Sequence, residues 1–384
     1  MTQPLLQAAD LRGAAHLTAD TVAGLASLVE AIHTRVSSLP QQPGPGATAP
    51  HEHGATRNAD DSAEALLGWL APALAGPDAR QAPSPEREAT LAALNGVLGD
   101  HLATTDHPLA IAMQFRHAGR PLPLERHALR SRPGGTTPKL LVLLHDLCLN
   151  DLQWQRAGHD HGEALARELG YTPVYLHYNS GLSVSTNGRI LAPLMEGLYS
   201  AWPQPVERLV MVGHGMGGLV ARSAIHHGPL MQRGGLRWPG RVDDLVCLGT
   251  PHLGAPDPTG HGVDPLLGGA LYAAPLARLG QMRSAGINDF RLGNVLKGPA
   301  SDDGTTEADR IGLPGGARCF AVAACVGPAG GSAKASLQGD GLVPVTSALG
   351  LGFEPEHQAL VHDTGHLDLL SSAEVYAWLR QWLG

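Results

Sequence analysis

One stretch, residues 209–222, restricts the fold of this chain more than any other. It reads LVMVGHGMGGLVAR, so that an apolar run ends abruptly in glycines and a helical pattern begins. This is typical of a buried strand, a tight turn and a helix. Gly213 and Gly217 fit positions where strand and helix approach too closely for a Cβ. In a G-x-S-x-G turn of this kind the central residue is a nucleophilic serine. Here that position holds Gly215.

Strands and helices are expected to alternate along most of the chain. Short apolar or alternating runs predict strands, and apolar positions repeating every three or four residues predict helices. The alternation is typical of a mainly parallel α/β sheet flanked by helices. Strands are predicted at 140–144, 173–177, 208–212, 244–248 and 318–325, an antiparallel edge pair at 111–115 and 122–129, helices at 162–169, 190–201 and the C-terminus, and a loop over 178–189.

The chain is expected to consist of an accessory part and a main domain. The accessory part is mainly helical and carries no chemical motif, and a Pro- and Gly-rich break within it predicts a mobile loop. In the main domain, a Gly- and Pro-rich stretch interrupts the alternation and predicts a cap or lid. The expected boundaries are 1–105 for the accessory part, with helices at 8–36, 62–74 and 84–102 and the loop at 39–60, and 106–384 for the main domain, with the cap at 255–314 and a helix in it at 266–279.

Composition excludes several classes of function. The chain has 384 residues and a formal net charge of −8 without a basic patch, which argues against nucleic acid as a partner. Its four cysteines lack CxxC spacing and are expected to be buried thiols. No metal site or cofactor is predicted. No apolar run reaches the ~18 residues of a membrane span, and no signal-peptide pattern occurs. We therefore expect a cytoplasmic protein and leave its oligomeric state open.

Two residues far downstream complete a hydrolase pattern. Asp340 lies in a predicted turn after the 318–325 strand, and His366 precedes the last helix. A nucleophile–acid–histidine order is typical of one class of hydrolase, in which the acid orients the imidazole and the histidine is general base and then acid. The competing residues for these roles are His362 and Asp363.

Backbone donors for an oxyanion are expected at two turns. The residue after the nucleophile position, Met216, supplies one N–H in this pattern, and the loop after an early strand supplies the other. Leu147 is the best candidate for the second donor. His145 and Asp146 are expected to support that loop, His145 by hydrogen bonding.

These motifs together resemble α/β-hydrolase-fold lipases and esterases of bacteria, especially the PGAP1-like (GPI inositol-deacylase-like) group. The resemblance covers roughly residues 139–384. It implies an α/β-hydrolase fold and a small-molecule ester or lipid-like ligand. The usual His-Gly of the oxyanion loop is His145-Asp146 in this chain. The residues that carry the resemblance are 212–219, with Gly213, His214 and Gly217 in the turn, 248–256, 178–181, 185–188, 340–344 and 366–370.

Gly215 leaves three interpretations open. Glycine adopts the strained turn geometry freely but has no oxygen with which to attack. The chain is then a carboxylic-ester hydrolase whose activity is lost or strongly reduced, a pseudoenzyme that binds an acyl or lipid-like ligand, or an interaction scaffold. On the sequence alone, we expect the single substitution Gly215→Ser to create ester hydrolysis that depends on His366.

Overall fold

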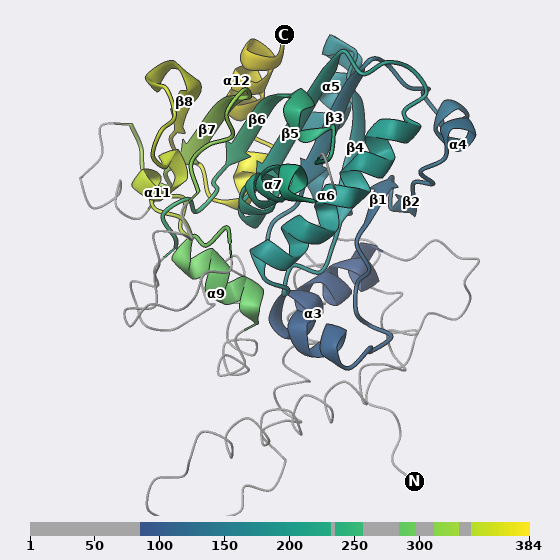
Figure 1. Cartoon of the computed structure of the whole chain (residues 1–384). Coiled ribbons are helices and arrows are strands. Elements are labelled where there is room, and N and C mark those ends of the chain that lie inside the picture. Colours follow the sequence, from purple (N-terminus) through teal and green to yellow (C-terminus); the bar gives the residue numbers. More distant parts are fainter. Residues whose placement is uncertain (1–84, 232–234, 256–283, 297–310, 330–338) are drawn as a thin grey trace, which may run out of the picture. The chain divides into compact units, whose positions relative to one another are not determined.

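The structure is a computed structural model that describes residues 85–231, 235–255, 284–296, 311–329 and 339–384 (Figure 1). The chain divides into two compact units. One comprises residues 1–91 and 259–283, and only 85–91 of it are described. The other comprises 92–258 and 284–384 and holds the sheet. The predicted helices at 8–36, 62–74 and 266–279, the predicted loop at 39–60 and most of the predicted cap lie outside the described residues.

The described part contains one mixed, mainly parallel sheet. Strands β3 to β8 pair in parallel, and β1 pairs antiparallel with both β2 and β4. Together with its flanking helices, this sheet gives the chain an α/β-hydrolase fold. The eight strands lie in the order β2 (Arg120–Pro121), β1 (Gln114–His117), β4 (Thr172–His177), β3 (Lys139–Leu144), β5 (Arg208–His214), β6 (Val242–Leu248), β7 (Arg318–Ala324) and β8 (Gln358–Val361).

Helices cover both faces of the sheet (Figure 1). Helices α6 and α7 pack together on one face, and α5 and α12 lie on the other. The α5–α12 face holds a core in which Leu143, Val212 and Val246 of the strands meet Leu165 and Leu379 of the helices. The described helices are α3 (Pro85–Thr104), α4 (Arg126–Arg130), α5 (His161–Leu169), α6 (Val184–Ala201), α7 (Met216–His227), α9 (Ala285–Leu292), α11 (Val345–Leu349) and α12 (Ala373–Leu383). Short 3-10 turns are η2 (Asp151–Trp154), η3 (Gly228–Leu230), η4 (Pro239–Arg241), η6 (Pro355–His357) and η7 (Leu367–Leu370).

Three expectations about elements need correction. The loop expected over 178–189 ends early, because the Ser183 side chain accepts a hydrogen bond from Thr186 N–H and begins α6 at Val184. The edge pair exists, but its second strand has only two residues, since Pro121 and Pro123 lack the N–H that a ladder needs. Helix α4 begins inside the range 122–129, where that second strand was expected. Strand β8 was not predicted, because its four residues are too short to show a period.

Helix α3 packs at the sheet edge where the strands end. Asn179, after β4, donates its side-chain amide to Gly99 O at 2.9 Å. A Cβ at Gly96 would overlap Cys148, in the loop after β3. Helix α9, the described helix of the predicted cap, is joined to α3 by a hydrogen bond from Ser284 Oγ to Gly96 O at 2.6 Å. In the described part of the chain, no helix has the length and apolar character that a membrane crossing requires.

Candidate active site

Four turns meet at one edge of the sheet because parallel strands all end on the same side. The turn at 145–149 follows β3, Gly215 follows β5, Asp340 lies beyond β7, and His366 follows β8. All the residues that the sequence singled out for chemistry therefore lie at the carboxyl edge.

The turn at Gly215 is a tight strand-to-helix connection. Gly215 has φ 50° and ψ −118°, and its N–H donates to Leu248 O at 2.9 Å. A Cβ on Gly213 would overlap the backbone N of Gly218, and one on Gly217 would overlap Leu144 O. These two glycines thus let α7 start directly against the ends of β5 and β3, as the sequence predicts.

His366 and Asp340 form a buried hydrogen-bonded pair. His366 Nδ1 lies 2.7 Å from Asp340 Oδ2, and His366 N–H donates to Asp340 O at 3.0 Å. Asp340 Oδ1 accepts hydrogen bonds from the N–H groups of Leu342 and Val343. The carboxyl group is therefore fixed by its own turn and in turn fixes the ring. His362 and Asp363, the competing candidates, do not take part in this pair.

The other nitrogen of His366 contacts Asp146. Its Nε2 lies 2.9 Å from Asp146 Oδ2. Asp146 Oδ1 accepts the Met216 N–H, the expected oxyanion donor, at 2.5 Å. The Asp146 side chain is only 4% exposed. The Asp146 carboxylate, in the loop after β3, is thus within hydrogen-bonding distance of both groups that would act in a serine ester site. These are the histidine nitrogen and the backbone donor.

Gly215 is the residue that makes room for this carboxylate. A Cβ built on Gly215 would overlap Cγ and both oxygens of Asp146, well inside the 3.0 Å that real Cβ atoms keep from other heavy atoms. A side chain at position 215 and the carboxylate of Asp146 therefore compete for the same space. The expectation that Gly215→Ser alone creates activity does not allow for this overlap.

The other residues that the sequence predicted for the site surround the contact between His366 and Asp146. His145 Nδ1 donates to Asp146 O at 2.8 Å, and its Nε2 accepts the Tyr178 N–H. The Tyr178 ring stacks on His145 with centroids 4.2 Å apart. Leu147 is buried in the same turn. His214 Nε2 lies 3.0 Å from His366 O, and the two imidazole rings lie 4.6 Å apart.

The protonation of His366 depends on its burial and on its two carboxyl neighbours. Burial by itself favours the neutral ring, but Asp340 and Asp146 together raise the pKa of His366 to about 10. Burial would raise the pKa of Asp146, yet its hydrogen bond and attraction to His366 lower it. Burial lowers the pKa of His214 to about 4 and that of His145 to about 3. At neutral pH the site thus holds an imidazolium between two carboxyl groups, with two neutral imidazoles nearby.

Sequence reasoning missed two features of the site. It assigned Asp146 to loop support and gave no sign that its side chain reaches His366, 220 positions away. It also missed Gly249, where a Cβ would lie 3.0 Å from His366 Cε1 and 3.1 Å from Asp340 Oδ2. The signal for Asp146 was its departure from the usual His-Gly pair in the same chain that lacks the serine.

One set of side chains within the described ranges could hold a metal ion. Ligand atoms of Asp146, His214 and His366 lie within 4.8 Å of one another. Both ring nitrogens of His366 already face carboxyl oxygens at hydrogen-bonding distance. A metal would therefore have to displace the proton between His366 and Asp146.

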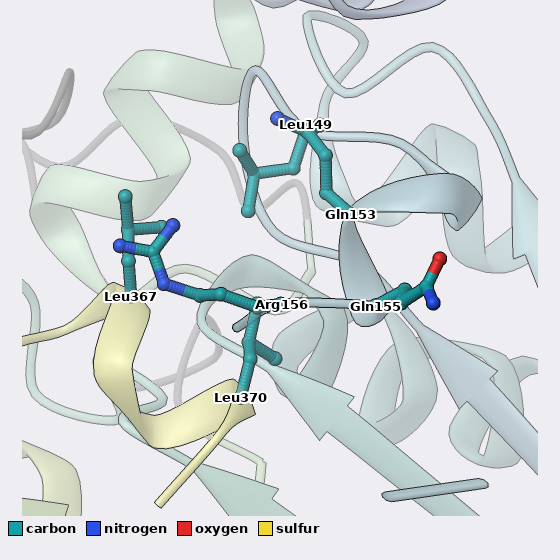
Figure 2. Close-up of a pocket in the computed structure, with 6 residues that line it drawn as sticks. All are labelled: Leu149, Gln153, Gln155, Arg156, Leu367 and Leu370. Atoms are coloured by element: carbon teal, nitrogen blue, oxygen red, sulfur yellow. The ribbon is translucent and has the colours of Figure 1, made fainter. Parts of the chain in front are cut away.

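A small pocket is lined by residues that lie close in sequence to Asp146 and His366 (Figure 2). Its volume is about 80 Å³. It lies between η7 on one side and η2 with its flanking residues on the other, lined by Leu149, Gln153, Gln155, Arg156, Leu367 and Leu370. Typical ligand pockets measure about 300–1,000 Å³, so this pocket is too small for a long acyl chain.

One family model agrees with the resemblance over part of the chain. Residues 188–263 match the family described as "PGAP1-like alpha/beta domain". Among solved structures, the mature form of a lipase from Bacillus licheniformis is 17% identical, with 64% of this chain and 91% of that chain covered and a TM-score of 0.40. A lipase-esterase related protein from Clostridium acetobutylicum is 13% identical, with 71% and 99% covered and a TM-score of 0.38. No match is found among curated proteins.

Proposed function

We propose that the chain is a carboxylic-ester hydrolase of the esterase and lipase type in which Gly215 occupies the nucleophile position. Hydrolysis through an acyl-serine intermediate is lost, because glycine has no oxygen to attack the ester. His366 is the general base of the ancestral site, Asp340 its orienting acid, and Met216 N–H an oxyanion donor. Leu147 N–H is the second donor, and His145 holds the loop that presents it.

One observation carries this proposal. A side chain at position 215 would point to the space between His366 Nε2 and Met216 N–H, the space now filled by the Asp146 carboxylate. A nucleophilic oxygen needs these two neighbours, a base within about 2.6–3.2 Å and a donor for the developing oxyanion. Position 215 is the point from which a serine would reach both.

The same observation sets the experiment. A serine at position 215 has room only when the Asp146 carboxylate is removed. We therefore expect the double variant Asp146→Gly/Gly215→Ser to hydrolyse 4-nitrophenyl acetate, whereas each single variant remains near the buffer rate. Adding His366→Gln to the double variant should lower the rate by about 10²–10⁴-fold, the range of general-base catalysis.

The control for folding is circular dichroism and thermal unfolding of all four variants. A folded double variant that stays at the buffer rate would remove the support for position 215 as the nucleophile position. Equal activity of the single variant Gly215→Ser would show that Asp146 does not block the site.

A further inference from the structure

The Asp146 carboxylate is held through both of its oxygens. Its two oxygens have different partners, His366 Nε2 for Oδ2 and Met216 N–H for Oδ1. We infer that Asp146 replaces the missing serine as the nucleophile and that its target is a saturated carbon, with an epoxide as the favoured class of substrate. The inference rests on the proposed function in one respect, that Gly215 marks the nucleophile position.

The contacts of Asp146 match the needs of a two-step reaction. In the first step a carboxylate oxygen attacks and becomes an ester oxygen. In the second step the ester must be hydrolysed, which needs a base for water and a donor for the negative charge that develops on the remaining oxygen. Oδ2 lies beside His366, which Asp340 orients, and Oδ1 already accepts the Met216 N–H. Both requirements are therefore met around one carboxylate.

The chemistry of a carboxylate selects a saturated carbon. Attack of Asp146 on an ester would first give a tetrahedral intermediate on the way to an anhydride. The carboxylate leaves this intermediate more readily than the alkoxide does, so the reaction would reverse. Attack on a saturated carbon that bears a leaving group forms an ordinary ester and does not reverse in this way. The Asp146 site is thus suited to alkyl electrophiles and not to the esters of the serine pathway.

The proton on His366 favours an epoxide over an alkyl halide. The ring lies between the carboxyl groups of Asp340 and Asp146, so its Nε2–H is available as an acid. In the first step Asp146 Oδ2 bonds to an epoxide carbon, the carbon–oxygen bond of the ring breaks, and the ring oxygen takes the proton from His366 Nε2. A halide would leave without needing that proton.

The second step restores the site. Neutral His366 takes a proton from water, whose oxygen adds to Cγ of Asp146, and the negative charge on Oδ1 is held by Met216 N–H. The bond between Cγ and the alkyl oxygen breaks, and the departing alkoxide takes a proton from His366. The resulting carboxylic acid returns its proton to His366. The net reaction adds one water to the epoxide and yields a diol.

Covalent labelling tests the first step on the full chain. Wild-type protein is incubated with 1,2-epoxypropane and, separately, with 1,2-epoxy-3-(4-nitrophenoxy)propane, and turnover is stopped with acid. We expect a mass increase of one epoxide, located by peptide sequencing at Asp146. The label should be released by hydroxylamine, which cleaves esters but not the thioether that the neighbouring Cys148 would form. Asp146→Asn should abolish the label, and Asp368→Asn, at a side chain that is 60% exposed, should not.

Isotope incorporation tests the second step without any variant. Wild-type protein turning over 1,2-epoxypropane in H₂¹⁸O should acquire ¹⁸O in the carboxyl group of Asp146, because water attacks Cγ. A wild-type chain that forms diol with ¹⁸O in the diol and none in Asp146 would overturn the inference. A label on wild-type Asp146 that is never hydrolysed would overturn it equally.

Absence of both label and diol with the two epoxides, in folded wild-type protein, would overturn the inference and leave Asp146 as an inert occupant of the serine space. This outcome is separate from the test of the proposed function. The ester assay on Asp146→Gly/Gly215→Ser can succeed while labelling fails, and labelling can succeed while the ester assay fails.

Discussion

At the scale of single residues, two departures from the usual hydrolase pattern form one change. Gly215 lacks the serine, and Asp146 replaces the usual glycine of the oxyanion loop. Their side-chain spaces overlap, so neither departure is independent of the other. An aspartate at 146 in this position requires a residue without Cβ at 215. Under the proposed function, the pair is a carboxylate in place of a hydroxyl.

The paired carboxyl groups predict an unusual titration of His366. Its pKa is raised to about 10, above the ordinary 6.5. Its contribution to stability is therefore fully present below pH 6.5 and is lost as the pH rises toward 10. We expect the imidazole Cε1–H resonance of His366, assigned by its absence in His366→Gln, to remain at its protonated position through pH 8.

Asp146→Asn is the matched control for this titration. It keeps the shape of residue 146 but removes one of the two negative charges, so the pKa of His366 should fall. The decrease in unfolding temperature between pH 7 and 10 should then be smaller than in the wild type. A wild-type resonance that titrates near 6.5 would contradict the ion-paired arrangement.

At the scale of elements, the connection from β5 to α7 contains two kinds of glycine. Gly213 and Gly217 face backbone atoms, of Gly218 and Leu144 respectively, which cannot move without shifting the strand or the helix. Gly215 faces a side chain, that of Asp146. The packing of α7 on the sheet therefore fixes the first two positions, whereas the third depends on a single neighbouring residue.

This distinction predicts which substitution can be rescued. Gly215→Ala should lower the free energy of unfolding by roughly 1–3 kcal/mol from its positive φ, and by more from the overlap with Asp146. Asp146→Gly should recover the part due to overlap, a coupling of about 0.5–3 kcal/mol. Gly213→Ala should be more destabilising, and Asp146→Gly should not rescue it.

Urea unfolding of the single and double variants measures these terms. Gly240→Ala is the control, because a Cβ there meets nothing within 4 Å and its φ is not positive. Additive effects of Gly215→Ala and Asp146→Gly would show that the two positions do not share space.

At the scale of the whole molecule, a buried carboxylate joins three strands to the C-terminus. Asp244, at the start of β6, pairs with Arg208 of β5 at 2.9 Å and with Arg318 of β7 at 2.6 Å. Arg208 also donates to Leu383 O at 2.8 Å, at the end of α12. This cluster lies at the amino ends of the strands, opposite the candidate site.

Asp244→Asn should therefore destabilise the sheet and the docking of α12 together. Hydrogen bonds to charged groups contribute about 1.5–3 kcal/mol, and we expect a loss of that size in urea unfolding. Asp243→Asn is the matched control, since that residue is exposed and its amide oxygen can still accept the Leu209 N–H. Equal effects of the two substitutions would contradict a special role for Asp244.

Much of the fold could be predicted because the signals are local. The 140–144 and 209–212 runs are apolar on both faces and form central strands, and the glycines at 213 and 217 indicate the close approach of α7. The start of α6 and the four-residue β8 were missed, since one depends on a cap by Ser183 and the other on pairing with β7. A strand as short as β8 forms only with a tertiary partner.

The sequence by itself determined which strands the site residues follow and that Asp340 pairs with His366. Both could be read from the sequence, because turn residues are local features and the order of site residues along the chain is a sequential one. Only the tertiary structure decided what fills the space above Gly215. Asp146 lies 70 positions from Met216 and 220 from His366, and no pattern of spacing joins them. They meet because parallel strands end at one edge, where a side chain from the β3 loop reaches the turn after β5.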